Sequence, residues 1–174
     1  MNNERTCKRV LVVDDDAAVR EAIKPVLEGA GYKVMLAVDG WEAVARFGRE
    51  QFDLMILDLN LPFLNGWDVF ERLTTRYPLV PVIIITGLPD QFQTALAAGV
   101  ATLMEKPVDA PVLLATIKEL RSEPPEKRLL RLGGHLSDTR LIRPASQPRF
   151  DGRRESSGQQ HRRHFHAVGR RPEG

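Results

Sequence analysis

The sequence predicts an α/β protein: a doubly wound, five-stranded parallel sheet with five flanking helices, followed by a disordered C-terminal tail. Short apolar runs of strand length recur through the first 105 residues, and most lack the polar alternation of strands that face water. Segments with apolar residues at helical spacing separate these runs. Regular alternation of strand and helix is typical of a parallel sheet that is covered by helices on both faces.

The predicted strands are short, and most end at a polar residue. The first, at residues 10–13, reads Val-Leu-Val-Val, and the fourth, at residues 82–85, reads Val-Ile-Ile-Ile. Such continuous apolar runs indicate parallel strands that are buried on both faces. Pro78 and Pro81 bracket the entry to the fourth strand. The remaining strands are expected at residues 33–38, 53–57 and 101–105.

The predicted helices carry recognisable start and stop residues. Asp16 is placed to cap the first helix, because its side chain can accept a hydrogen bond from a free backbone N–H. Gly29 and Gly31 end that helix, and Pro25 inside it is expected to kink it or to shift its last turn. Pro111 is tolerated in the first turn of the last helix. The five helices are expected at residues 17–28, 41–49, 67–76, 90–98 and 109–120.

Charge divides the chain into an acidic domain and a basic tail. Residues 1–120 hold 12 Lys and Arg against 17 Asp and Glu, a net charge of −5, whereas residues 121–174 hold 13 against 6, a net charge of +7. Leu129, Leu130 and Leu132 allow one short amphipathic turn, but from about residue 133 the composition buries too little apolar surface to offset the entropy of ordering. We therefore expect a flexible N-terminus at residues 1–7, a domain at residues 8–121 and a basic, largely disordered tail at residues 122–174.

The composition indicates a cytoplasmic protein. Cys7 is the single cysteine, so no internal disulfide can form and a reducing compartment is expected. No apolar run is long enough to span a membrane, and residues 1–8 are too polar for a signal peptide.

Polar side chains follow four of the predicted strands at the point where each strand ends. Asp14 and Asp15 follow the first strand and Asp58 follows the third. Thr86 follows the fourth and Lys106 the fifth. Because the carboxyl ends of parallel strands lie at one edge of a sheet, where ligands bind in open α/β folds, we expect these groups to converge on one site.

The chemistry of these groups favours phosphate and a hard cation. Three crowded carboxylates repel one another, and Mg²⁺ relieves the repulsion because it prefers oxygen ligands, commonly one or two carboxylates together with phosphate oxygens. A carboxylate can also act as a nucleophile and form an aspartyl phosphate. Lys106 and the metal would then share the phosphoryl oxygens, and Thr86 would bond one of them. The sequence therefore predicts a phosphorylatable aspartate beside a magnesium site.

At these residues the chain resembles the receiver domain of two-component response regulators, over about residues 8–121. The resemblance implies a flavodoxin-like sheet with the strand order 2-1-3-4-5, and a cis peptide bond between Lys106 and Pro107. The matching motifs are Val12-Val13-Asp14-Asp15, Asp58 followed by Pro62 and Gly66, Ile85-Thr86-Gly87, and Lys106-Pro107.

The resemblance also implies a role for each residue of the site. Asp58 would be the phosphoacceptor, and Lys106 would bind the phosphoryl group. Asp14 and Asp15 would form the acidic pair that binds the metal, and the backbone carbonyl of Asn60 would complete the metal shell.

Signal output depends on a further position in the family. Thr86 would couple phosphorylation to a shape change, usually together with a Tyr or Phe three residues before the site lysine. Here that position is Leu103. The aromatic switch is therefore in doubt, and coupling through the fourth helix is an alternative. The segment between Thr86 and Gly99 is also a residue or two shorter than the family's usual length.

The resemblance implies partners as well. A sensor histidine kinase or a phosphotransfer protein would supply the phosphoryl group. A downstream protein target would read the change at the face formed by the fourth helix, the fifth strand and the fifth helix, where two copies could also dimerise. The protein would be a phosphoacceptor signalling protein and not an enzyme, with its chemistry limited to Asp58.

Two other functions are weighed against this one. Asp14-x-Asp16 after an apolar strand resembles the first motif of haloacid-dehalogenase-like phosphatases, but Ala18 occupies the position of the required Thr or Val and no cap domain is visible. The basic tail could bind nucleic acid through phosphate contacts. We expect a flexible, functionless extension instead, and the remnant of a longer output region is a further alternative. Because it shows no helix-turn-helix pattern, specific DNA recognition is not expected.

Overall fold

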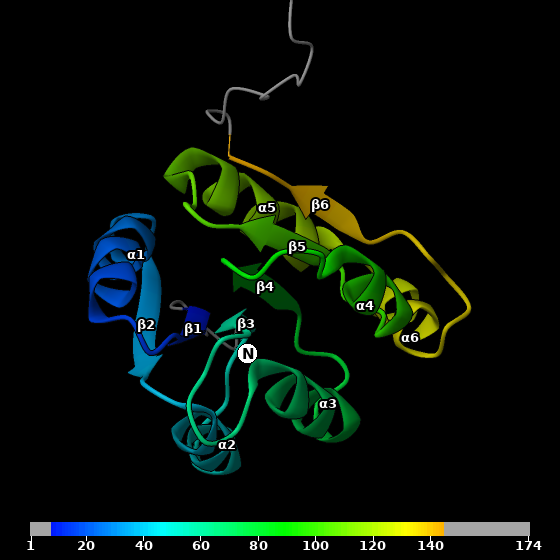
Figure 1. The fold of residues 1–174 in the computed structure, drawn as a ribbon, viewed down its shortest axis with the longest axis horizontal. Coiled ribbons are helices and arrows are strands. Elements are labelled where there is room, and N and C mark those ends of the chain that lie inside the picture. Colours follow the sequence, from blue (N-terminus) through cyan, green and yellow to red (C-terminus); the bar gives the residue numbers. More distant parts are fainter. Residues whose placement is uncertain (1–7, 145–174) are drawn as a thin grey trace, which may run out of the picture.

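The structure, a computed structural model, describes residues 8–144, which contain one six-stranded parallel sheet (Figure 1). The strands lie in the order β2-β1-β3-β4-β5-β6, and every neighbouring pair is parallel. The doubly wound parallel sheet with the order 2-1-3-4-5 is thus confirmed, and a sixth strand extends it beyond β5. The bounds are β1 Lys8–Val13, β2 Tyr32–Ala37, β3 Leu54–Asp58, β4 Val82–Thr86, β5 Thr102–Glu105 and β6 Arg140–Ile142.

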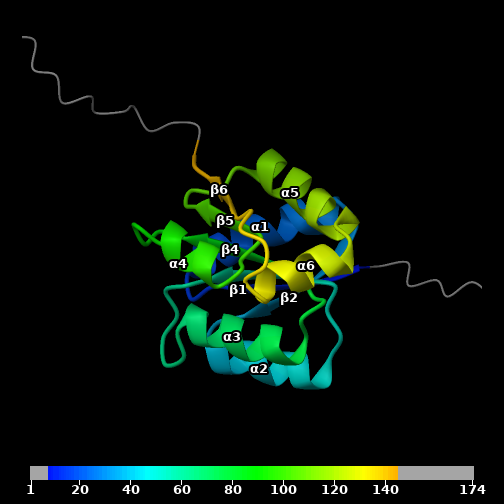
Figure 2. The same ribbon diagram turned by 90° about the vertical axis from the view of Figure 1, so that its right-hand side faces the viewer.

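Helices cover both faces of the sheet, as Figure 2 shows from the side. Their bounds are α1 Ala17–Gly29, α2 Gly40–Arg49, α3 Gly66–Arg76, α4 Phe92–Ala97, α5 Ala110–Ser122 and α6 Pro125–Leu132. Apolar residues of α1 and α5 pack with Val10 and Val12 of β1 on one face. Those of α2, α3 and α4 pack with Leu11 and Val13 on the other face. Successive strand residues thus enter opposite cores, as the period of two requires.

The predicted helix boundaries hold with small shifts that have local causes. Asp16 caps α1, since its Oδ1 accepts a hydrogen bond from Ala18 N at 2.8 Å. Pro25 does not end α1, which continues to Gly29. The expected helix at residues 90–98 begins later, at Phe92, because Asp90 has a φ of 57°, outside the right-handed helical region.

Among residues 8–144, no helix has both the length and the apolar character needed to cross a membrane.

The largest departure from the sequence analysis is in the segment assigned to the tail. Residues 125–132 form α6, and residues 140–142 form β6 on the outer edge of β5. The predicted disorder from residue 133 is therefore wrong for β6, while the part that concerns residues 145–174 lies outside the described residues. Within residues 8–144, the expected five strands and five helices become six of each.

Arginine side chains anchor α6, which lies where the sequence analysis allowed one short amphipathic turn. Arg128 and Arg131 are buried, whereas Leu129 and Leu130 are about half exposed. Arg128 donates hydrogen bonds to the backbone carbonyls of Leu79 and Leu120. Both Nη groups of Arg128 thus find acceptors, and its Nε lies 3.8 Å from Glu123 Oε2, so the buried charge is partly compensated. The helix therefore packs through polar contacts that hydrophobic periodicity does not detect.

The second buried arginine joins α6 to the segment before β6. Arg131 Nε donates to Asp138 Oδ1 at 2.6 Å, and its Nη1 donates to Glu123 Oε2 at 3.2 Å. The hydrogen bond from Arg131 and its positive charge lower the pKa of Asp138, so the pair remains ionised at neutral pH. Thr139 Oγ1 adds a hydrogen bond to Val100 O at 2.7 Å. Residues 123–139 are thus part of the folded domain.

Gly99 makes the close approach of α6 possible. Its φ of 73° lies in the left-handed region, and a Cβ there would lie 2.7 Å from the carbonyl carbon of Arg131 and 2.9 Å from Leu132 Cα. Both obstacles are backbone atoms, which cannot rotate away as a side chain can. The turn between α4 and β5 therefore accepts α6 only if residue 99 is glycine.

We predict that Gly99→Ala lowers the free energy of unfolding by more than about 2 kcal/mol, because it adds backbone strain to a steric clash. Gly29→Ala is the control, since nothing lies within 4 Å of the added Cβ. Urea denaturation of the two variants measures the difference. Equal stability would contradict the described packing of α6 against the α4–β5 turn.

Candidate functional site

Three aspartates meet at the carboxyl edge of the sheet, as the sequence analysis expected. Asp14 and Asp15 follow β1, and Asp58 ends β3, which pairs directly with β1. One carboxylate oxygen from each lies within 4.8 Å of the others. Asp14 and Asp58 are buried, while Asp15 is exposed. The switch point of the sheet thus places two buried carboxylates and one accessible carboxylate side by side.

Lys106 joins this cluster from β5. Its Nζ lies 2.8 Å from Asp14 Oδ2 and 3.0 Å from Asp58 Oδ2. The peptide bond between Lys106 and Pro107 is cis, which confirms the expectation from the family resemblance. Lys106 N also donates to Thr86 O at 2.9 Å, which continues the ladder between β4 and β5 beyond the last strand residue.

The charges of the cluster are strongly coupled. Burial raises the pKa of Asp14, although hydrogen bonds from Lys106 and from the backbone of Asp16 act in the opposite direction. Burial alone would lower the pKa of Lys106, but hydrogen bonds and attraction from Asp14 and Asp58 outweigh burial and raise it. Lys106 therefore remains an ammonium group at neutral pH and compensates part of the negative charge.

The loop after β3 is folded tightly over the end of that strand. Gly66 N donates to Leu59 O at 3.0 Å, and a Cβ on Gly66 would lie 2.5 Å from Leu59 Cα. Leu61 and Leu64 are buried, so the loop is anchored on both sides of Phe63. Glycine at position 66 is therefore a steric requirement of this loop. Asn60 lies exposed in this loop, and the metal-binding role of its carbonyl stays a prediction.

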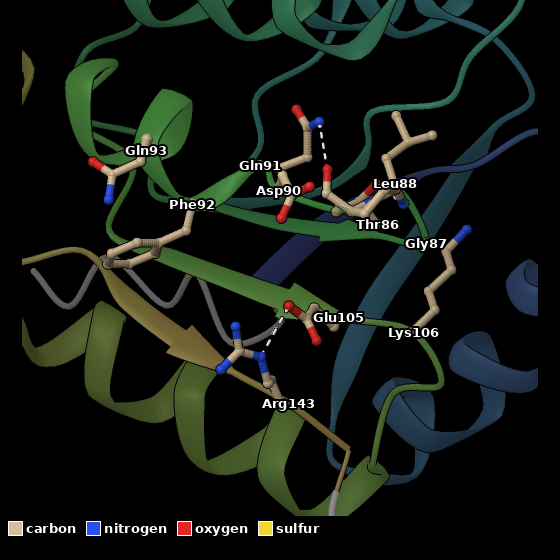
Figure 3. A pocket seen from close by; sticks show the side chains of 11 residues that line it. Thr86, Gly87, Leu88, Asp90, Gln91, Phe92, Gln93, Glu105, Lys106 and Arg143 are labelled. Atoms are coloured by element: carbon tan, nitrogen blue, oxygen red, sulfur yellow. Dashed lines mark hydrogen bonds and ion pairs between the residues drawn. The ribbon is translucent and has the colours of Figure 1, made fainter. Parts of the chain in front are cut away.

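Thr86 and Leu103 occupy the positions that the sequence analysis connected with output. Thr86 is buried, and its Oγ1 accepts a hydrogen bond from Leu88 N at 3.0 Å, within the loop after β4. Thr86 and Lys106 line a cavity of about 450 Å³ (Figure 3). Leu103 is fully buried in the core that faces α2, α3 and α4. The coupling role of Thr86 stays a prediction.

Two further contacts at this edge were not foreseen. Arg20 Nη1 donates to the backbone carbonyl of Asp14 at 2.6 Å and thereby holds the start of the acidic loop. Glu105, next to Lys106, accepts a hydrogen bond from Arg143 Nε at 3.2 Å. Neither arginine belongs to a recognisable motif, and Arg143 comes from a segment that was expected to be disordered.

The donor set fits a divalent cation with a preference for oxygen ligands. Asp58 Oδ1 is buried and has no hydrogen-bond partner among the described residues. A buried carboxylate oxygen without a partner costs free energy, which a cation beside it would recover. Asp14, Asp15 and Asp58 could therefore hold a metal ion, and oxygen-only donors favour Mg²⁺ over softer metals.

Sequence comparisons agree with this geometry. Residues 10–118 match the response regulator receiver domain family. The transcriptional regulatory protein CrdR of Helicobacter pylori is 34% identical over 121 residues, 68% of this chain and 57% of that protein. The response regulator MprA of Mycobacterium leprae is 36% identical over 114 residues, 64% of this chain and 50% of that protein. The chain thus spans about half the length of these curated relatives.

One of these names bears on an earlier expectation. CrdR is named a transcriptional regulatory protein, so the comparisons do not bear out the expectation that this protein lacks specific nucleic-acid binding.

Solved structures show the same fold. A CheY-like receiver domain protein from Methanospirillum hungatei has a TM-score of 0.65 and 35% identity, covering 70% of this chain and 98% of its own. The chemotaxis response regulator CheY4 of Vibrio cholerae has a TM-score of 0.61 and 30% identity, covering 66% of this chain and 98% of its own. The chain therefore belongs to the response regulator receiver domain family, the signalling domains of two-component systems.

Proposed function

We propose that Asp58 accepts a phosphoryl group from a phosphohistidine of a sensor histidine kinase or phosphotransfer protein. The observation that carries this proposal is the environment of the Asp58 carboxylate. It is buried, lies beside the Asp14 and Asp15 carboxylates, is paired through Oδ2 with Lys106, and its Oδ1 has no partner among the described residues. A carboxylate in such a position can act as a nucleophile toward phosphorus.

The proposed step is a direct displacement at phosphorus. An Asp58 carboxylate oxygen attacks the phosphorus atom, the new O–P bond forms, and the P–N bond of the phosphohistidine breaks. The electron pair of that bond stays on the imidazole nitrogen of the donor protein. The reaction is proposed to take place at Asp58 of the protein itself, so no separate substrate would be converted.

Asp14, Asp15, Asp58 and the Asn60 carbonyl are proposed to hold Mg²⁺. A bound Mg²⁺ supplies positive charge that offsets the negative charge of the phosphoryl oxygens. The Lys106 ammonium is proposed to leave its ion pair with Asp58 and to donate to a phosphoryl oxygen. The Thr86 hydroxyl, whose oxygen accepts a hydrogen bond from Leu88 N, is proposed to donate its own proton to another.

The output of the whole protein is proposed to be a protein–protein contact in the cytoplasm. A second candidate, transcriptional control, rests on the names of two relatives, both of which extend well beyond the matched region. Residues 8–144 form the receiver fold together with α6 and β6. Nucleic-acid binding would therefore be sought in segments outside these residues or in a partner protein. Phosphorylation changes the charge at Asp58, and a two-state element must convert that change into a new surface.

We predict that the full chain gains one phosphoryl group when incubated with acetyl phosphate and Mg²⁺, and that Asp58→Asn abolishes the gain. Intact-mass measurement follows the reaction, with EDTA as the metal-removal arm. Asp53→Asn is the matched control, because Asp53 precedes β3 at the opposite end of the strand. A stable phosphoryl adduct on Asp58→Asn would overturn the assignment of the phosphoacceptor.

We also predict that Lys106→Met binds Mg²⁺ roughly ten-fold more tightly, because it removes a positive charge that competes for Asp14 and Asp58. The same variant should retain less phosphoryl group, since a donor to the phosphoryl oxygens is lost. Calorimetric titration measures the affinity, and Lys118→Met, which changes an exposed lysine on α5, is the control. Weaker Mg²⁺ binding by Lys106→Met would show that the ammonium does not compete with the cation.

A further inference from the structure

The strand β6 covers an edge that would otherwise be open. It pairs in parallel with β5, with Thr102 opposite Arg140, Leu103 opposite Leu141 and Met104 opposite Ile142. Figure 1 shows β6 along the outer side of β5, between α4 and α5. The sequence analysis assigned signal output to this side of the molecule. An uncovered β5 would expose backbone N–H and C=O groups that readily pair with another chain.

The strand is held much more weakly than the helix that precedes it. It has three residues: Arg140 is exposed, and Leu141 and Ile142 are only partly buried at the edges of the two cores. The ion pairs of Arg140 and Arg143 are exposed as well. Arg140 pairs with Glu119, and these side chains are 52% and 57% exposed. Arg143 pairs with Glu105, and these side chains are 68% and 36% exposed. Exposed ion pairs of this kind contribute little stability. The buried Arg131, in contrast, anchors α6, so β6 can open locally while α6 stays in place.

One of these weak contacts reaches the phosphorylation site. Glu105 is the register partner of Thr86 on β4 and directly precedes Lys106. Thr86, Glu105, Lys106 and Arg143 all line the cavity of about 450 Å³, and Figure 3 shows the Arg143 guanidinium against the Glu105 carboxylate. Because Lys106 N is bonded to Thr86 O, the two residues are coupled through the backbone. A shift of both toward a phosphoryl group would displace Glu105 from Arg143.

We propose that β6 is a releasable latch: the edge of β5 is covered while Asp58 is unmodified, and phosphorylation weakens the Glu105–Arg143 contact and frees β6. Release exposes the backbone of β5 and the adjoining surface of α4 and α5. The proposal rests on the proposed function, because it takes phosphorylation of Asp58 as its trigger. The juxtaposition that carries it is that of the weakly held β6 and the two residues next to the site, Glu105 and Lys106.

Hydrogen–deuterium exchange of the full chain tests the latch, with magnesium beryllofluoride as the probe that imitates the phosphoryl group. We expect peptides covering residues 140–144 and 102–105 to exchange about two- to five-fold faster with the probe, the range that corresponds to losing one exposed ion pair. Peptides of α6 should be unchanged. Unchanged or slower exchange in β6, with the probe bound at Asp58, would overturn the latch.

Two variants separate the link to the site from simple fraying. Arg143→Gln should speed the exchange of β6 without the probe by about two- to five-fold, and the probe should then add little. Arg140→Gln removes the contact with Glu119 on α5, so its β6 should exchange faster but still respond to the probe. Identical behaviour of the two variants would show that Glu105 and Arg143 do not transmit the signal.

Failure of the proposed function gives a different pattern. If the acetyl phosphate experiment leaves Asp58 unlabelled, and the probe leaves hydrogen exchange around residues 58–66 unchanged, the phosphoacceptor assignment fails. The latch then fails with it. If Asp58 is labelled and only β6 is silent, the latch alone is refuted. By reciprocity, a working latch also requires Arg143→Gln to bind the probe more tightly than the unmodified chain does, by about the same factor by which it speeds β6 exchange.

Discussion

The contact of the Lys106 ammonium with the carboxylates of Asp14 and Asp58 is the interaction on which the rest of the site depends. Two buried carboxylates this close together would repel strongly, and burial raises the pKa of Asp14. One ammonium compensates them only in part, and it leaves Asp58 Oδ1 without a partner among the described residues. This shortfall of positive charge makes the edge of the sheet receptive to a cation and sensitive to a new negative charge.

The order of the strands creates that interaction from residues far apart in the chain. Because β1 lies between β2 and β3, the loop after β1 meets the end of β3. The pairing of β4 with β5 then brings Lys106 to the same edge, beside Thr86. The opposite edge of β5 carries β6, so a single strand has Lys106 directly after its end and the added strand along its side. Strand β5 therefore connects the site at Lys106 with the edge of the sheet that β6 covers.

Much of this could be predicted from the sequence, because the relevant signals are local. Apolar runs that end in Asp14, Asp58 and Thr86 identify buried parallel strands, and Asp16 shows where a helix begins. The extension could not be predicted in the same way. In α6 the buried positions are Arg128 and Arg131, while Leu129 and Leu130 are exposed, and the acceptors of Arg128 lie on other segments, Leu79 and Leu120. A three-residue strand such as β6 has no readable period, and its pairing depends on the preceding helix being docked.

A crystal structure of the full chain with Mg²⁺ and beryllofluoride would show directly whether the acidic edge of the sheet binds a cation and a phosphoryl group as proposed. We expect the metal on Asp14, Asp15, Asp58 and the Asn60 carbonyl, with beryllium bonded to an Asp58 carboxylate oxygen. Lys106 Nζ and Thr86 Oγ1 should each contact a fluorine. A metal bound elsewhere, or Lys106 still paired with both Asp14 and Asp58 in the presence of the bound probe, would contradict the account.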